Sequence, residues 1–313
     1  MAFEGEPVTE KPKYRIMFTR HAERLPTGEL SEEGRKHADR KGELLRGSAE
    51  VLKGYASDHP SKRAVDTANL ISESTGIRSA LTEKPYETRE IRDFQYDVFA
   101  PDLTKHLKIA KDMINEVTLR DGGLSTERNE NGELKIDIEK PIAGMAVEEQ
   151  ERIAAIRQNN QKIGLDYLLS QPEVVERLAS RMAERLVHEM QVMSRAQRSR
   201  KEKPLERDMV LNNVGHGVFT EALFQKAAVY VDDQKNKHEG VSLNREEFGG
   251  YLEPLESFSI DLDDPSNLPD LIPVTFERPD RPHGKVFLKL DALKELAAVY
   301  NERKKIIRER KNS

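Results

Sequence analysis

The chain has 313 residues, of which 34% are charged and 36% hydrophobic, and its formal net charge is −5 at pH 7. This acidic balance argues against a general nucleic-acid binder, which usually carries a basic surplus. The lack of cysteine excludes disulfides and thiolate metal sites. Residues 1–13 predict a disordered polar tail with no secretory signal, and no run reaches the ~20 apolar residues of a membrane span. We therefore expect a soluble, cytoplasmic protein that is not bound to a membrane.

After this tail, strand and helix patterns alternate. Tyr14–Thr19 is a short apolar run typical of a buried strand, and Ser31 with two following glutamates resembles a capped helix start. A second strand pattern over Val51–Ser57 leads into an amphipathic helix pattern over Ser61–Ser74. A third strand is compatible with residues 79–82. This order predicts a three-layer α/β/α sandwich with a mostly parallel central sheet.

The middle of the chain has mainly helical spacing. Apolar residues recur there every three or four positions, and Pro172 opens a long amphipathic pattern. A basic cluster over residues 195–203 follows, which we interpret as a solvated helix end that complements the helix dipole. Contact with RNA or another anionic partner is the alternative. We predict a helical insertion over 102–207, able to cap a site, within an α/β domain made of 14–101 and 208–313.

The strand and helix alternation resumes near the end of this insertion. Met209–Val214 has a strand pattern, and a glycine-flanked histidine and a helix pattern follow it. Residues 230–245 are polar and predict a loop. Two later strand patterns, at 249–262 and 285–290, precede a final helix that becomes strongly basic.

Three strand ends carry residues suited to phosphate chemistry. Arg20 and His21 follow the first strand, Arg63 lies in the first turn of the helix after the second, and His216 follows Met209–Val214. Carboxyl ends of parallel strands share one edge of a sheet, where ligands bind. Guanidinium groups clamp phosphate oxygens, and imidazole can act as a nucleophile. Any one of these residues alone is better explained as an ordinary surface or core residue.

An acidic segment follows the third possible strand. A carboxyl group there could protonate a leaving oxygen, and the candidates are Glu87, Glu90 and Asp93. The ordinary explanation for each is a solvated acid in a charged loop.

Taken together, these segments resemble the histidine phosphatase superfamily, also called the phosphoglycerate mutase-like fold, in the branch that contains mutases and broad phosphatases. The matching segments are, in chain order, FTRHAER, LSEEGRKHA, RAVDTA, TREIRDF and VGHGVF. The resemblance covers roughly residues 14–100 and 208–262 and leaves out the helical insertion and the C-terminal tail.

The resemblance implies a role for each matching residue. His21 would be the nucleophile, Arg20 and Arg63 would bind the phosphoryl oxygens, His216 would donate to the same oxygens, and Glu90 would be the general acid. The implied activity is a metal-independent phosphatase that acts through a phosphohistidine on a small phosphorylated metabolite, with no cofactor. The alternatives are a phosphoglycerate mutase-type phosphotransferase and an inactive scaffold whose insertion binds a partner.

The chain also departs from the family pattern. Asp58 and His59 stand where the family usually has small hydroxyl residues, and residues 94–97 replace an aromatic-rich motif after the acid. Glu87 therefore remains a rival to Glu90. The sequence specifies neither the substrate nor the oligomeric state.

Overall fold

The structure is a computed structural model that describes residues 13–23, 29–57, 63–77, 89–91, 101–124, 130, 145–200, 205–244, 248, 250–277 and 285–312. Several features named above lie outside these ranges: residues 1–12, Asp58, His59, residues 79–82, Glu87, Asp93 and residues 94–97.

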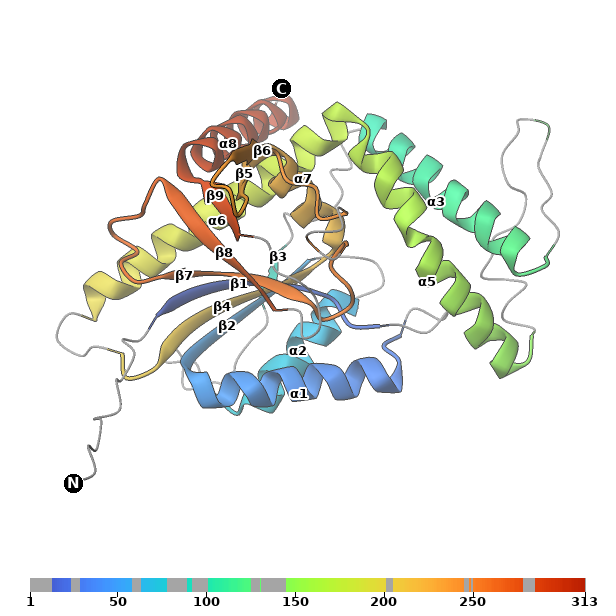
Figure 1. The fold of residues 1–313 in the computed structure, drawn as a ribbon, viewed down its shortest axis with the longest axis horizontal. Coiled ribbons are helices and arrows are strands. Elements are labelled where there is room, and N and C mark those ends of the chain that lie inside the picture. The colour runs from blue at the N-terminus through green and yellow to red at the C-terminus, as the bar shows by residue number, and fades with distance from the viewer. Residues whose placement is uncertain are drawn as a thin grey trace.

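A mixed sheet runs through the centre of the described structure (Figure 1). Its nine strands are β1 (Tyr14–Arg20), β2 (Ala49–Ser57), β3 (Arg89–Ile91), β4 (Asp208–Gly215), β5 (Ala228–Val231), β6 (Lys237–Glu239), β7 (Ser257–Leu262), β8 (Leu271–Glu277) and β9 (Lys285–Lys289). Their order across the sheet is β3-β2-β4-β1-β7-β8-β9-β5-β6. The described helices are α1 (Glu32–Ser48), α2 (Arg63–Thr75), α3 (Pro101–Asp121), α5 (Val147–Leu169), α6 (Pro172–Ser199), α7 (Gly217–Ala227) and α8 (Leu290–Asn312).

The sheet has a parallel half and an antiparallel half. Strands β3, β2, β4 and β1 are parallel to one another, whereas β7 pairs antiparallel with β1, and the remaining pairings are antiparallel too. The α/β class is therefore confirmed, but the sheet is mixed and not mostly parallel. The reason is that β7, β8 and β9 follow one another closely along the chain, and short connections allow only antiparallel neighbours.

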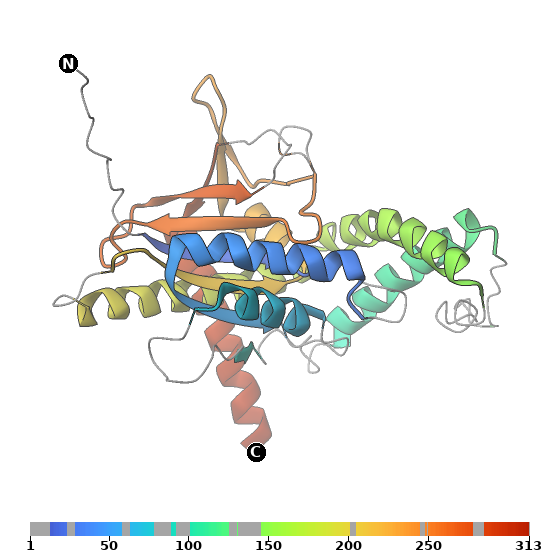
Figure 2. The same cartoon turned by 90° about the horizontal axis from the view of Figure 1, so that it is seen from below.

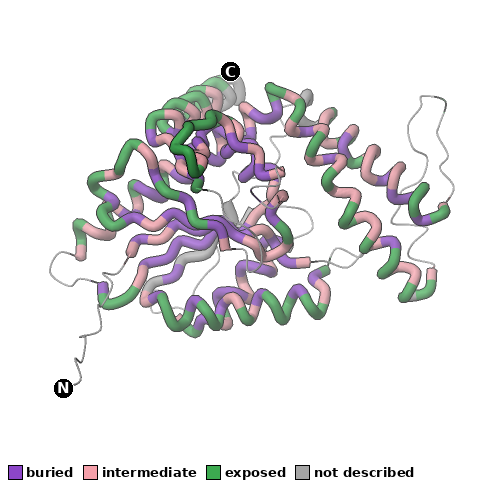
Figure 3. The backbone as a smooth tube through the Cα atoms, viewed as in Figure 1, coloured by how far each residue is buried: buried purple, intermediate pink, exposed green. Residues whose placement is uncertain are grey.

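Helices cover both faces of the sheet, which gives the predicted three layers. On one face, α1 and α2 pack against Met17, Leu52 and Val210. On the other, α6, α7 and α8 pack against Ile16 and Phe18. Strand β1 is apolar on both faces because alternate side chains enter the two layers. Figure 3 shows buried residues along the central strands, whereas buried and exposed residues alternate along α1.

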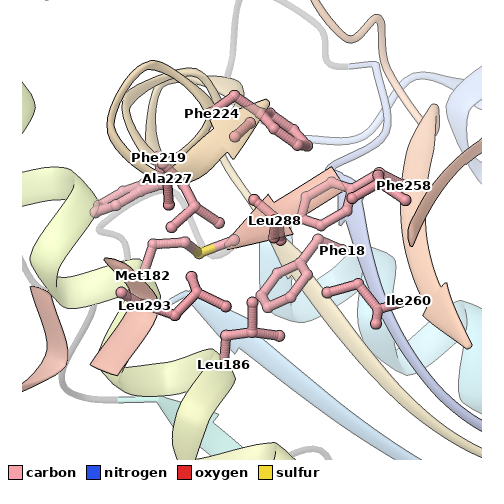
Figure 4. Packing of buried hydrophobic residues seen from close by; sticks show 14 of the residues in the cluster. Phe18, Met182, Leu186, Phe219, Phe224, Ala227, Phe258, Ile260, Leu288 and Leu293 are labelled. Carbon is pink, nitrogen blue, oxygen red and sulfur yellow. The ribbon is translucent and has the colours of Figure 1, made fainter. Parts of the chain in front are cut away.

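The larger core lies between the sheet and α6, α7 and α8 (Figure 4). Phe18 and Phe258 stack there with ring centroids 5.0 Å apart. Phe224 meets Phe258 edge to face from α7, and Leu186 joins the same cluster from α6. This packing fixes the position of α7 relative to the carboxyl end of β1.

The three helices that the structure describes in the predicted insertion differ in where they pack. The apolar stripe of α6 is buried in the same core as β1, α7 and α8. In contrast, α3 and α5 pack mainly on each other and extend beyond the sheet (Figures 1 and 2). They approach closely because Gly164 of α5 lies against Ile114 of α3, where a Cβ atom would come within 2.5 Å of the isoleucine. The 102–207 boundary stays a prediction, and the projecting part is α3 with α5. Of the helices that the structure describes, none is both long and apolar enough to cross a bilayer.

Candidate active site

His21 and His216 meet at the carboxyl ends of two adjacent parallel strands. Strand β1 pairs with β4 so that Arg20 lies opposite Gly215, which places the next residue of each strand at the same level. The backbone N–H of His21 donates to the Gly215 carbonyl over 3.0 Å. The two imidazole rings are 5.0 Å apart between centroids and are inclined by 66°. The structure therefore brings together two of the predicted site residues.

The hydrogen bonding of His21 selects one tautomer of its neutral ring. The side chain is buried, with 6% of its surface exposed. Its Nδ1 atom lies 2.8 Å from the backbone carbonyl oxygen of Ala22. Because a carbonyl oxygen can only accept, Nδ1 must carry the hydrogen, and Nε2 then carries the lone pair of the neutral ring. A nucleophilic Nε2 is what attack on phosphorus requires.

Arg20, the residue before His21, is held from two sides. Its Nη2 donates to Oε1 of Gln161 on α5 over 2.7 Å, and its Nη1 donates to the Leu252 carbonyl. Burial lowers the pKa of Arg20, while the carboxylates of Glu253 and Glu256 raise it. An arginine side chain stays cationic under such shifts. These contacts use two of its five N–H donors, so a held guanidinium can still present donors to an anion.

Two helices begin at this edge of the sheet. His216 occupies the N-cap position of α7, and Gly217 opens that helix beside the Arg20 side chain. Arg63 is the first residue of α2, which follows β2. Backbone N–H groups at a helix N-terminus and the positive end of the helix dipole both attract anions.

Thr67 joins the His21 segment to α2. It is fully buried, and its Oγ1 accepts a hydrogen bond of 3.1 Å from the backbone N–H of Ala22. Thr67 lies four residues after Arg63, which is one turn along the helix. This bond fixes the first turn of α2, and with it the backbone of Arg63, next to the His21 segment.

Glu90 lies farther from His21 than the other predicted residues. It belongs to β3, where it pairs with Ala56 of β2. Strands β2 and β4 separate β3 from β1, so the backbones are three strand spacings apart, about 14 Å. Glu90 is at the same edge of the sheet but not beside the histidine pair, and its rival Glu87 lies outside the described residues. The general acid stays a prediction.

Buried polar residues of β1 and α6 form hydrogen bonds to the two asparagines of β4, close to the histidine pair. Asn213 Nδ2 donates to Glu189 of α6 over 2.8 Å, and Asn212 accepts from the Thr19 hydroxyl over 2.9 Å. Glu189 is fully buried beside Arg185. Burial raises the pKa of Glu189 to about 7, although Arg185 and Asn213 oppose the shift.

The sequence prediction missed three groups of residues that contact this site: Asn212 with Asn213, Thr67 and Gln161. The two asparagines gave a signal, because paired amides are unusual inside an apolar strand pattern and need buried partners. Thr67 is part of the RAVDTA segment but was given no role. Gln161 is in a helix without any motif, and nothing in the sequence singles it out.

The wall between the site and the core is apolar. Phe18, Met182 and Phe219 line a small cavity together with Arg20 and His216. Within the described ranges, no group of three or more histidine, aspartate or glutamate side chains could hold a metal ion.

The fold is that of an α/β protein, and it places His21, His216, Arg20 and the first residues of two helices at the carboxyl edge of the parallel strands. No protein-family model and no curated protein matches the chain. Several solved structures are similar in fold. A phytase from Citrobacter braakii has a TM-score of 0.47 and 12% identity, with 92% of this chain and 97% of that chain covered.

Two other similar structures are named for phosphoglycerate compounds. A mycobacterial glucosyl-3-phosphoglycerate phosphatase has a TM-score of 0.34 and 17% identity, covering 85% of this chain and 97% of that one. A phosphoglycerate mutase from Plasmodium falciparum has a TM-score of 0.32 and 13% identity, covering 88% and 99%. All three belong to the superfamily that the sequence motifs resemble. These TM-scores are all below 0.5.

Proposed function

We propose that this protein is a metal-independent phosphatase that hydrolyses a small phosphate monoester through a phosphohistidine on His21. One observation carries the proposal: the rings of His21 and His216 are 5.0 Å apart at the carboxyl edge of β1 and β4. Arg20 is adjacent and is anchored by Gln161 and the Leu252 carbonyl. A nucleophile beside fixed positive charge is the main requirement of phosphoryl transfer.

In the first step, Nε2 of His21 attacks the phosphorus atom. The P–N bond forms while the bond from phosphorus to the leaving alcohol oxygen breaks, and a carboxylic acid gives that oxygen its proton. Arg20, Arg63, His216 and the N-termini of α2 and α7 would stabilise the negative charge of the transferring group. Glu90 is the acid that the sequence resemblance implies.

In the second step, water attacks the phosphohistidine. The carboxylate left by the first step takes a proton from the water, a new P–O bond forms and the P–N bond breaks. Inorganic phosphate leaves, and His21 returns to its neutral state with hydrogen on Nδ1. The Ala22 carbonyl maintains that tautomer between turnovers, since it accepts only from a protonated Nδ1.

The test compares wild-type protein with His21→Ala on p-nitrophenyl phosphate. We expect loss of the nucleophile to lower kcat by more than about 10³-fold. His37→Ala is the matched control, because His37 is an exposed histidine on α1, and it should leave the rate unchanged. Quenching with alkaline detergent during turnover, which preserves the acid-labile P–N bond, should trap phosphate on the wild type and on His37→Ala but not on His21→Ala. Activity that survives in His21→Ala would refute the assignment, as would an inactive wild type, which would favour a scaffold.

A phosphoglycerate mutase is the alternative with the same first step. It would return the phosphoryl group to the substrate and exclude water from the phosphohistidine. Incubation with 3-phosphoglycerate separates the two activities. Release of inorganic phosphate supports the phosphatase, whereas conversion to 2-phosphoglycerate without release would replace it with the mutase.

A further inference from the structure

A second hollow lies at the opposite end of β1 from the histidine pair. It has a volume of about 400 Å³ and is bounded by the C-terminal part of α6, the connection from β7 to β8 and the start of α8. Leu262, the last residue before that connection, pairs with Tyr14 at the beginning of β1. The histidine pair follows the end of this seven-residue strand, so the two places are separated by about 20 Å.

The floor of this hollow is apolar. Met190 of α6 has 2% of its surface exposed and Leu290 of α8 has 8%, and both line the hollow together with the half-buried Leu268. The connection that carries Leu268 is held on α6 by Ser266, which contacts the Ser194 hydroxyl over 3.1 Å. The floor is therefore formed by three segments that are held together and covered on their inner side by the core.

The rim of the hollow is positively charged. Arg195 and Arg198 lie on the last turns of α6, and Lys294 lies on α8 one turn after Leu290. All three are exposed, and no carboxylate among the described residues forms an ion pair with any of them. The helix dipole explains cations at the end of α6, but it does not explain Lys294, which is near the N-terminal end of its helix.

We propose that this hollow binds a small amphipathic anion: an organic acid with an alkyl or aromatic body and one anionic head. The body would lie on Met190, Leu268 and Leu290, and the head would pair with the three cations. A bounded apolar hollow with a few charged groups at one side is typical of small-molecule sites. A nucleic acid needs no apolar floor for its phosphates, so the floor favours a small ligand. This proposal is independent of the function proposed for His21.

Calorimetry of the full chain with decanoate tests the proposal. We expect one decanoate per chain, at least tenfold weaker binding at high salt, and no saturable binding of decanol, which has the same body without the charge. Failure of decanoate to bind saturably would overturn the proposal.

Two double variants locate the site. Arg195→Gln with Arg198→Gln should weaken decanoate binding at least tenfold. Arg35→Gln with Arg40→Gln removes two exposed arginines from α1 and should leave binding unchanged. Equal effects of the two double variants would contradict the proposal. Binding of an RNA oligonucleotide that is lost in the first variant, without decanoate binding, would replace the small ligand with nucleic acid.

Discussion

Arg20 owes its orientation to a residue from the projecting helix pair. Its Nη1 atom donates to the Leu252 carbonyl, and its Nη2 atom donates to the side chain of Gln161. A positioned arginine loses less freedom when it binds an anion than one that must first be ordered. Gln161 is therefore a positioning residue for the proposed phosphatase.

We predict that Gln161→Ala lowers kcat/KM on p-nitrophenyl phosphate by about tenfold, since a hydrogen bond to a charged group contributes on the order of 1.5 kcal/mol. The inhibition constant for inorganic phosphate should rise in parallel. Gln161→Glu keeps an acceptor but adds a negative charge beside the site, so it should raise KM further. Asn159→Ala, on the exposed side of α5, should have no effect. An unchanged phosphate inhibition constant in Gln161→Ala would contradict the positioning role.

Apart from Glu90, the site residues that the sequence predicts share one property. Each is an arginine or a histidine that stands directly after a strand or at the start of a helix, where such a side chain suggests binding or catalysis. Arg20, His21 and His216 follow apolar strands directly, so local sequence is enough to find them. Gln161 is an ordinary helix residue, and it matters only because α5 packs beside a strand 141 positions away in the chain. Contacts of this kind depend on tertiary packing, which spacing and composition do not encode.

At the scale of elements, α5 is attached to the α/β domain by a second contact. Asp166 of α5 accepts a hydrogen bond from the Tyr251 hydroxyl and another from Asn244 over 3.3 Å. Burial is the largest cause of a raised pKa for Tyr251, and the hydrogen bond to Asp166 raises it further. The phenol therefore keeps its proton and remains a donor. This contact and the one to Arg20 hold α5 at the edge of the sheet where the histidine pair lies.

We predict that Tyr251→Phe loosens α3 and α5 without unfolding the protein. The phenyl ring keeps its packing, but the hydrogen bond to Asp166 is lost. Amide hydrogen exchange in α5 should accelerate, while the midpoint of urea unfolding changes little, because the main core is untouched. Tyr300→Phe on α8 is the control. Unchanged exchange in α5 would show that Asp166 does not attach the helix.

The elements that the sequence predicts best are those with long regular patterns. Ser31 caps α1 as expected, since its hydroxyl accepts from the Gly34 N–H over 2.9 Å. The antiparallel half was predicted less well. Strand β6 and the last two residues of β5 lie within the segment 230–245, which predicts a loop because these strands are short and partly exposed. Strand β8 contains Pro273, a residue that disfavours a strand, and it is stabilised by pairing with β7 and β9.

At the scale of the whole molecule, the buried Glu189 joins helix α6 to the central sheet. It lies on α6, yet it binds Asn213 of β4 through one oxygen and Arg185 through the other. A carboxyl group in this position has no water to solvate its charge. Its titration therefore affects the stability of the whole fold and not only the geometry of the site.

We predict that Glu189 makes the protein less stable as the pH rises from about 4.5 to 7. Its folded pKa is raised to about 7 from an ordinary value of 4.5. Between these values the folded state holds a proton that the unfolded state has released, so the unfolding free energy falls by at most ~1.4 kcal/mol per pH unit. In Glu189→Gln this contribution is absent. Urea unfolding at pH 5, 6, 7 and 8 should therefore show wild-type stability falling relative to the variant up to pH 7 and levelling above it. Glu184→Gln, also on α6, is the control, and it should run parallel to the wild type. Wild-type stability that stays constant or rises relative to Glu189→Gln as the pH increases would mean instead that Glu189 is ionised throughout and paired with Arg185.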